Sequence, residues 1–332
     1  MPLDLVTGAS GLVGGNLVRT LVAQGRAVRI LVRSTSQLQH LADLPLERAV
    51  GDVTDPASLR RACDGVDVVY HCAAVVSMWQ RLAPQMWTAN VAGTEHLLAA
   101  IRQAGVRRLV HCSTVDAIGL PETPADPPST ETTPWNWDRL GLDNAYARTK
   151  LESQRRVLAA AAADVDAVVV NPTYMFGAWD AKPSSGRMIL EVAAGRAVGY
   201  TDGGNNFVDV EAVVDGMIAA AARGVRGECY ILGGENRSYG EIFGEIARLV
   251  GVRPPRFAIP YVAARVGGWI GDGVAAVTGR EPTVNTITAK MGYVRHYFDP
   301  SKAVRELGLR QPPVSAAIER AVRWFRQVGM LP

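Results

Sequence analysis

The sequence predicts an α/β protein with a doubly wound parallel sheet and a smaller, interleaved C-terminal domain. Short apolar runs alternate with helical patterns through the first two-thirds of the chain, which indicates parallel strands joined by crossover helices. The apolar runs carry Val and Leu at both alternating positions, as strands covered on both faces do. After Asn171 the pattern loosens, and proline pairs such as Pro254-Pro255 interrupt it. We therefore expect a second domain that is interleaved with the first.

The expected elements follow in chain order. A loop is expected at Pro121–Pro134, because its five prolines exclude a helix or central strand. The predicted first domain comprises residues 1–174 and 207–233, and the second comprises 175–206 and 234–332. Strands are expected at Leu3–Thr7, Ala27–Val32, Val66–Cys72, Leu109–Ser113, Val165–Asn171 and Glu228–Leu232. Helices are expected at Gly14–Gln24, Pro56–Ala62, Ala89–Ala104, Ala145–Ala163, Met188–Ala194 and the run Val208–Ala222.

Composition excludes several classes of protein. Lys and Arg number 35 against 32 Asp and Glu, and a scattered net charge of +3 does not indicate nucleic-acid binding. The four cysteines lie far apart without a C-x-x-C pair, so we expect reduced core thiols in a cytoplasmic protein. The N-terminus shows no signal peptide, and no clustered His and Cys indicate a metal site.

The longest late apolar segment is Tyr261–Thr278. Arg265, Asp272 and several glycines interrupt it, so we do not expect it to span a membrane. A helix that packs within the substrate domain is the favoured interpretation, and a helix resting on a membrane surface is the alternative.

A glycine-rich turn follows the first expected strand. Gly8 permits a tight turn, Gly11 permits close approach of the backbone to a pyrophosphate, and Gly14 permits close packing of helix on strand. A helical pattern begins at once, so the diphosphate would face the N-terminus of that helix. The context predicts a dinucleotide site, whose expected contacts also include Ser10, Leu12 and Val13.

The residues after the second strand favour NADP(H) over NAD(H). Sites that prefer the unphosphorylated ribose usually place Asp or Glu about 20 residues past the glycines, but no acidic residue occurs between Arg26 and Ala42. Arg33 and Ser34 stand there instead, and a guanidinium with a hydroxyl suits a 2′-phosphate. An ordinary solvated arginine is the alternative. Asp52 is expected either to accept from the adenine amine or to cap its own turn.

Tyr146 and Lys150 form the second group of residues that indicates a function, after the glycine-rich turn. Four residues apart on an expected helix, they share one face. Nine tyrosines and four lysines give only about 0.1 chance pairs at this spacing. An ammonium beside a phenol lowers its pKa toward the working range of an acid/base catalyst. Ser113 and Thr114 follow a strand at the edge where such sheets bind ligands, and their hydroxyls either hold a carbonyl oxygen or form a turn.

Six motifs, spread in order over nearly the whole chain, resemble those of the extended short-chain dehydrogenases/reductases. The dihydroflavonol-4-reductase-like branch is most similar, together with the bacterial group labelled hopanoid-associated sugar epimerases, and 3β-hydroxysteroid dehydrogenases are more distant. The resemblance implies a Rossmann domain with a small C-terminal substrate domain. The motifs are Thr7-Gly8-x-x-Gly11-x-x-Gly14, His71-x-Ala73-Ala74, Asn90-Val91-x-Gly93-Thr94, Tyr146-x-x-x-Lys150, Asn171-Pro172 and Phe207-Val208-Asp209-Val210.

The resemblance also implies roles. Tyr146 becomes the proton donor, and Lys150 lowers its pKa and binds the nicotinamide ribose. The family's catalytic Ser falls on Thr114, which is a departure that keeps a hydroxyl, with Ser113 as the alternative. Many relatives are dimers that pair the helices expected at Ala89–Ala104 and Ala145–Ala163, whereas monomers occur in the reductase-like branch. The remaining implied cofactor contacts are Val53, Ala73, Ala74, Asn90, Asn171 and Pro172.

An apolar and aromatic set of side chains is expected over the nicotinamide, and for any single member core packing is the favoured interpretation. Together they favour a bulky hydrophobic carbonyl or alcohol over a diphosphate sugar, which would need Arg or Lys at its phosphates. Asn205 and Asn206 stand where nucleotide-sugar enzymes often carry an Arg, although Arg187 or Arg196 keeps that class open. The predicted substrate contacts are Val76, Trp79, Trp135, Tyr174, Met175 and Met188, and Val75, Met78, Trp137 and Phe176 belong to the same lining.

We therefore predict an NAD(P)-dependent oxidoreductase that moves hydride between nicotinamide and such a substrate. The alternatives are a nucleotide-sugar epimerase or dehydratase that retains its cofactor, and a 3β-hydroxysteroid dehydrogenase-like sterol enzyme. A non-catalytic cofactor sensor is less favoured, because the Tyr146/Lys150 pair is present. The expected partner is a small molecule, in a cytoplasmic monomer or homodimer.

Overall fold

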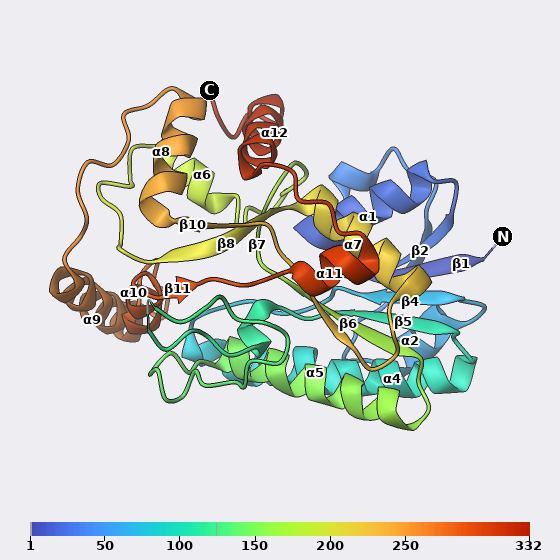
Figure 1. Ribbon diagram of the computed structural model, residues 1–332. Helices are drawn as coiled ribbons and strands as arrows, with labels where there is room; N and C mark the ends of the chain where they lie inside the picture. Colours follow the sequence, from blue (N-terminus) through green and yellow to red (C-terminus); the bar gives the residue numbers. More distant parts are fainter. Residues whose placement is uncertain (1, 124) are drawn as a thin grey trace.

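The centre of the molecule is a seven-stranded parallel sheet with the order β3-β2-β1-β4-β5-β6-β9 (Figure 1). The computed structural model describes residues 2–123 and 125–332. The chain order reverses between β1 and β4, and sheets of this kind bind ligands at that point of their C-terminal edge. The predicted fold class is confirmed. The strands are β1 (Leu3–Thr7), β2 (Ala27–Val32), β3 (Glu47–Val50), β4 (Val68–His71), β5 (Arg108–Cys112), β6 (Ala167–Pro172) and β9 (Cys229–Leu232).

Helices cover both faces of this sheet (Figure 1). One face packs against α1 (Leu12–Ala23), α7 (Val210–Arg223) and α11 (Ser301–Leu307), through a buried cluster that includes Leu17 and Val213. The other packs against α2 (Pro56–Cys63), α4 (Gly93–Ala104) and α5 (Ala145–Ala163), through a cluster that includes Leu97 and Val157. Burial on both faces explains why the strands read as continuous apolar runs.

Two helix starts differ from the sequence prediction. The first helix begins at Leu12 rather than Gly14, so Gly14 lies in its first turn. The helical run expected at Val208–Ala222 is only partly helical. Val208 lies in strand β8, and α7 starts at Val210. The Asp209 side chain accepts a hydrogen bond from the backbone N–H of Glu211 and caps this helix.

A second, smaller sheet is built around β8 (Gly204–Asp209), which pairs with β7 (Tyr174–Phe176), β10 (Glu235–Ser238) and β11 (Arg295–His296). The boundary expected after residue 206 falls inside β8, and the division into two domains stays a prediction. Three helices pack beside this sheet through a cluster that includes Phe207, Ile242 and Phe325. They are α6 (Arg187–Ala193), α8 (Tyr239–Val250) and α12 (Val314–Gln327).

The remaining elements are loops, turns and short helices. Residues 121–123 and 125–134 form the expected loop, which residue 231 meets through a hydrogen bond from its N–H to the Glu131 carboxylate. The helix expected at Ala89–Ala104 is α-helical only from Gly93, because a wider, π-type turn occupies Trp87–Ala92. Further elements are α3 (Ala83–Met86), α9 (Tyr261–Thr278), α10 (Thr286–Met291) and short 3₁₀ turns at Gln39–Leu41, Gln80–Leu82 and Val115–Ala117.

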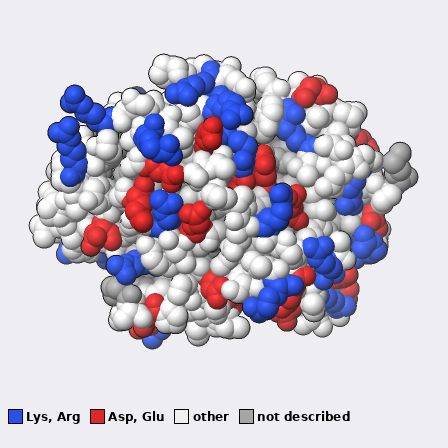
Figure 2. Space-filling view, turned by 45° about the horizontal axis from the view of Figure 1, so that its top comes forward, with Lys and Arg blue, Asp and Glu red and all other residues white. Residues whose placement is uncertain are grey.

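The distribution of charged side chains on the surface agrees with the small net charge of the sequence. On the face in Figure 2, positive and negative side chains are interspersed rather than gathered into a field of one sign. Within the described residues, no helix has the length and apolar character needed to cross a bilayer. The four cysteines Cys63, Cys72, Cys112 and Cys229 are all free thiols.

Candidate active site

The glycine turn after β1 folds tightly against the end of β4. Gly8 has a φ of +75°, and a Cβ there would lie 2.6 Å from the Cys72 carbonyl carbon. A Cβ at Gly14 would lie 2.4 Å from the Gly8 oxygen. Gly11 differs, because its added Cβ would meet only that same oxygen, at 3.5 Å, and the residue is exposed. Packing inside the chain thus requires glycine at positions 8 and 14, whereas Gly11 leaves room for a ligand.

The N-terminal end of α1 is open to an anion. Its N-cap is Gly11, which provides no side-chain hydrogen bond, and no acidic residue stands in the first turn. The first N–H groups, including those of Leu12 and Val13, are therefore without a side-chain acceptor, and half-buried Ser10 precedes them. This arrangement fits the diphosphate of a dinucleotide, as expected from the sequence.

Arg33 and Asp52 follow neighbouring strands, β2 and β3, at the same sheet edge. Arg33 is two-thirds exposed, and its Nε lies 4.0 Å from the Asp52 carboxylate. The other Asp52 oxygen accepts hydrogen bonds of 2.9 Å from the Thr54 N–H and hydroxyl, so Asp52 caps its turn. Ser34 is exposed beside Arg33, whereas Val53 packs against Gly93 at the start of α4. Arg33 and Asp52, which the sequence predicts to contact the adenosine part of the cofactor, therefore lie close together in the structure, with Ser34 next to Arg33.

Asn90 links the segment after β4 to helix α5 through hydrogen bonds. Its amide exchanges two hydrogen bonds with the backbone of Val75, at 2.7 and 3.0 Å. Its Nδ2 also donates to the Thr149 hydroxyl at 3.1 Å, and this hydroxyl donates to the carbonyl of Tyr146. Asn90 is 2% exposed. It therefore holds the segment after β4 against α5, and the adjacent Ala73 and Ala74 lie half-buried and exposed, respectively.

A buried histidine extends this set of hydrogen bonds to β1. His71 Nδ1 lies 2.8 Å from the Thr7 hydroxyl, and its Nε2 lies 3.2 Å from the hydroxyl of Thr94. The Thr7 hydroxyl also accepts from the N–H of Ala73. Burial lowers the pKa of His71 to about 3, so the ring stays neutral. The motif residues Thr7, His71 and Thr94 thus act as one positioning unit.

Tyr146, Lys150 and Thr114 meet at the C-terminal end of β5. Lys150 is 4% exposed, and its Nζ donates to the Cys112 carbonyl oxygen at 2.9 Å. Tyr146 shares a side-chain hydrogen bond with Thr114, and this contact favours Thr114 over Ser113 as the partner hydroxyl. The helix α5 begins at Ala145 because the Asn144 side chain accepts from the Ala147 N–H. The predicted constellation is therefore brought together.

The electrostatics of Tyr146 differ from the prediction. The expected lowering of its pKa by Lys150 is wrong for this structure, in which burial raises the pKa of Tyr146 above its usual range. The charge of Asp116 raises it further, and only the hydrogen bond with Thr114 opposes them. Burial in turn lowers the pKa of Lys150.

Asp116 is a site residue that the sequence reasoning missed. Its carboxylate is close enough to both Tyr146 and Tyr239 to raise their pKa values. Burial raises the pKa of Asp116 itself to about 7. Within the described part of the chain, no side chain or backbone N–H is hydrogen-bonded to its carboxylate, while its carbonyl accepts from Trp135 Nε1 at 3.1 Å. Its position two residues after Thr114 was the only available signal.

Two buried polar atoms beside this site lack a partner in the structure. They are the Ser113 hydroxyl and the Asn171 Oδ1. The Asn171 Nδ2 donates to the Thr114 carbonyl at 2.7 Å and to Gln154 at 2.8 Å, so Asn171 fixes Thr114 against α5. Asn171 and Pro172 end strand β6. Orphaned polar atoms at this edge fit a polar ligand such as a nicotinamide nucleotide.

The predicted substrate residues divide into two groups. Trp135 contacts Asp116, Trp79 is half-buried, and Val76 is 65% exposed. The others lie in packed clusters: Tyr174 donates to the Ser185 carbonyl, and Met175 and Met188 pack against separate cores. Trp137 and Phe176 are fully buried, so core packing, the interpretation favoured for any single residue of this set, is their role.

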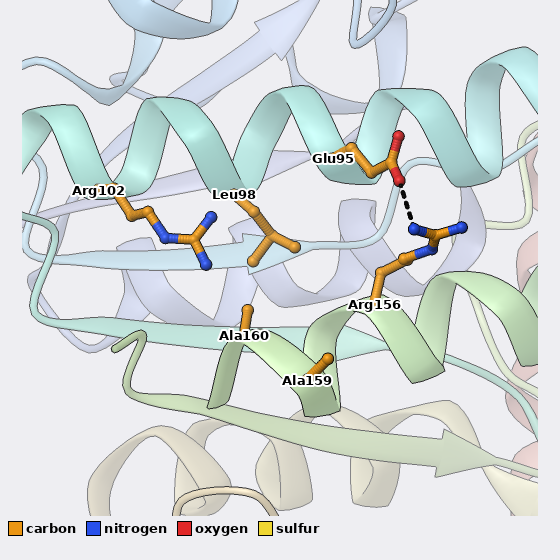
Figure 3. Close-up of a pocket in the computed structure, with 6 residues that line it drawn as sticks. All are labelled: Glu95, Leu98, Arg102, Arg156, Ala159 and Ala160. Atoms are coloured by element: carbon orange, nitrogen blue, oxygen red, sulfur yellow. Dashed lines mark ion pairs between the residues drawn. The ribbon is translucent and has the colours of Figure 1, made fainter. Parts of the chain in front are cut away.

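A shallow hollow lies away from this site, between α4 and α5 (Figure 3). Glu95 and Arg156 form an ion pair of 3.1 Å across it, and Leu98 lies in its floor. None of the predicted site residues lines it. In the described ranges, no cluster of His, Cys, Asp and Glu is suited to hold a metal ion.

Comparison with known proteins agrees with this geometry. The model of the NAD-dependent epimerase/dehydratase family matches residues 5–233, and the chain belongs to this family. The chain is similar to a putative dihydroflavonol 4-reductase from Synechocystis, with 36% identity over 98% of this chain and 94% of the relative. It is also similar to sterol demethylase protein B from Methylococcus capsulatus, with 36% identity over 98% of this chain and 99% of the relative.

A solved structure, that of gox2253, superposes with a TM-score of 0.87 and 36% identity over 100% of both chains. The predicted family and fold are therefore confirmed. Reductases and dehydrogenases among the relatives support NAD(P)-dependent oxidoreductase activity, the enzyme class that the sequence predicts.

Proposed function

We propose that this protein is an NADP(H)-dependent oxidoreductase that interconverts a bulky apolar ketone and its alcohol. The observation that carries the proposal is the meeting of Tyr146, Thr114 and Lys150 at the C-terminal edge of the sheet, beside the open N-terminus of α1. We keep the predicted division into a cofactor domain, residues 1–174 and 207–233, and a substrate domain. We also place the protein in the cytoplasm, as a monomer or homodimer.

Each residue has a separate task in this chemistry. The bound nicotinamide supplies or accepts the hydride. Tyr146 gives its phenolic proton to the substrate oxygen during reduction and takes it back during oxidation. Thr114 shares a hydrogen bond with Tyr146 and steadies the same oxygen. Lys150, anchored on the Cys112 carbonyl, holds a positive charge on the helix face that carries Tyr146.

The proposed preference for NADP(H) rests on Arg33. Its guanidinium is largely exposed at the end of β2, and the nearby Asp52 carboxylate is partly occupied by Thr54. An exposed guanidinium with Ser34 beside it suits a phosphate more than a lone hydroxyl.

The proposed apolar substrate follows from the available side chains. Arg187 and Arg196, the two arginines that would serve a sugar diphosphate, both lie against Glu191, at 3.9 and 2.6 Å. Trp135 contributes an aromatic side chain that donates a hydrogen bond to the Asp116 carbonyl, and Asp116 lies near Tyr146. A sterol is a specific candidate, because a relative of 36% identity is named sterol demethylase protein B.

The test is NADPH oxidation with a panel of apolar ketones, sterones included, compared with nucleotide sugars. We expect consumption of NADPH with an apolar ketone, and NADH to serve less well. Tyr146→Phe should abolish most turnover while NADPH affinity changes only a few-fold, and Tyr261→Phe, on the exposed helix α9, is the matched control. Retained turnover in Tyr146→Phe, or sugar epimerisation without net NADPH consumption, would contradict the proposal.

A further inference from the structure

Helix α9 turns an apolar face outward. Only Gly268 and Ala275 of its 18 residues are buried. On the opposite side, spaced three and four residues apart, large apolar side chains are strongly exposed. The exposed fractions are 72% for Val262, 43% for Val266, 57% for Trp269, 62% for Ile270 and 89% for Val277. A surface helix of a globular protein normally shows the reverse pattern.

The inward side of α9 is made of small residues. A Cβ on Gly268 would lie 2.9 Å from the Thr286 backbone of α10, and one on Gly271 would lie 1.9 Å from the Val284 oxygen. Asp272 also faces α10, because its carboxylate accepts hydrogen bonds from the N–H and hydroxyl of Thr286. Arg265 lies over the Tyr261 and Trp269 rings. Packing within the chain therefore uses the narrow face and leaves the wide apolar face uncovered.

Basic residues outnumber acidic ones in the segment that contains α9. Residues 253–290 contain five basic and two acidic residues, so this segment alone carries as much net charge as the whole chain, +3. Both acids are engaged, Asp272 by Thr286 and Glu281 by the Ser77 hydroxyl at 2.5 Å. Arg253, Arg256 and Arg280 are exposed and form no ion pair with any residue in the described ranges.

We propose that α9 docks the protein on the surface of an anionic lipid bilayer. The apolar face enters the boundary between headgroups and acyl chains, and the flanking arginines lie against lipid phosphates. A second copy of the chain suits this face less, because a two-fold contact would bring the unpaired arginines together.

Docking would place the bilayer next to the proposed substrate site. The segment after α9 is tied to the chain before Trp79, because Asn285 Nδ2 donates to the Met78 carbonyl at 2.9 Å and Glu281 accepts from Ser77. In Figure 1, α9 lies at the left edge of the molecule, beside α10. An apolar substrate dissolved in the bilayer would then reach Trp79 without crossing water. This consequence, unlike docking itself, rests on the proposed function.

The test is flotation of the full chain with vesicles of phosphatidylcholine alone or mixed with phosphatidylglycerol. We expect flotation with the anionic vesicles, weakened by salt, and little with the neutral ones. Val277→Glu and Ile270→Glu should each weaken binding at least tenfold. The matched control is Val225→Glu, at a 56% exposed position that follows α7, which should bind as the wild type does.

Three results would overturn the proposal: no flotation with anionic vesicles, flotation unchanged in both α9 variants, or a wild-type dimer that Val277→Glu dissociates. Thermal unfolding and NADPH affinity should be unaltered in the variants, because the changed side chains are exposed and lie outside the proposed cofactor site. NADPH affinity and turnover of a water-soluble ketone are measured separately, so the failure of docking and the failure of the proposed function give different results.

Discussion

Replacement of Asp116 by Asn tests the electrostatics of the site most directly. Burial raises the pKa of Asp116 from 3.8 to about 7 in the folded protein, so folding favours its protonated form. The associated stability is fully present below the unfolded pKa and is lost as the pH rises through the folded pKa. At about 1.4 kcal/mol per pKa unit, the loss amounts to about 4 kcal/mol between pH values below 4 and above 7.

The Asp116→Asn variant carries no such charge and should escape this loss. Between pH 5.5 and pH 8, the free energy of unfolding of the wild type should fall by about 2 kcal/mol more than that of the variant. Urea titrations at both pH values, without added nucleotide, measure this difference. Asp64→Asn, at an exposed position that ends α2, is the matched control and should run parallel to the wild type.

Parallel curves for the wild type and Asp116→Asn would refute the reasoning. The same substitution has a kinetic consequence, since the Asp116 charge raises the pKa of Tyr146. Alcohol oxidation needs Tyr146 to accept a proton, so oxidation at a fixed alkaline pH should be faster in the variant. An unchanged rate of oxidation would show that Asp116 does not act on Tyr146 during turnover.

Three further outcomes are expected. Gly14→Ala places a Cβ 2.4 Å from the Gly8 oxygen, so NADPH affinity measured by calorimetry should drop at least tenfold, whereas Gly244→Ala, with open space around it, should not alter it. Asn90→Ala leaves the Val75 N–H and carbonyl unpaired and should lower the free energy of unfolding by about 2–4 kcal/mol in urea titrations. Arg33→Ala removes a charge-assisted contact worth about 1.5–3 kcal/mol, so NADPH affinity should fall about 10- to 100-fold while NADH affinity stays nearly constant; an equal loss for both nucleotides would contradict the assignment.

The fold was predictable because its signals are local. Continuous apolar runs marked the central strands within one or two residues, and the helix expected at Ala145–Ala163 has those bounds in the structure. The glycine turn was equally predictable from the sequence. Tight backbone contacts allow only glycine at positions 8 and 14, so the turn leaves a visible pattern of glycines. The small sheet was harder, because β11 contains only Arg295 and His296 and depends on tertiary pairing with β8.

The electrostatics could not be predicted because they depend on burial. A Tyr and a Lys four residues apart say nothing of the desolvation that raises the pKa of Tyr146, nor of the Asp116 charge that approaches it. The exposure of the apolar face of α9 could not be predicted for the same reason, since it too depends on burial. Its residues form an apolar pattern that suits a packed helix equally well, and only the three-dimensional structure shows that the large side chains are exposed while Gly268 faces α10.

Asp116 is positioned to titrate near neutral pH. His71 stays neutral, with a pKa of about 3, while burial raises that of Tyr239 to about 12 and that of Tyr146 further still. Asp116, at about 7, lies between these extremes and faces both tyrosines. A pH profile of ketone reduction should therefore show an ionisation near neutrality, and the loss of that ionisation in Asp116→Asn would assign it to this carboxylate rather than to the histidine or the phenols.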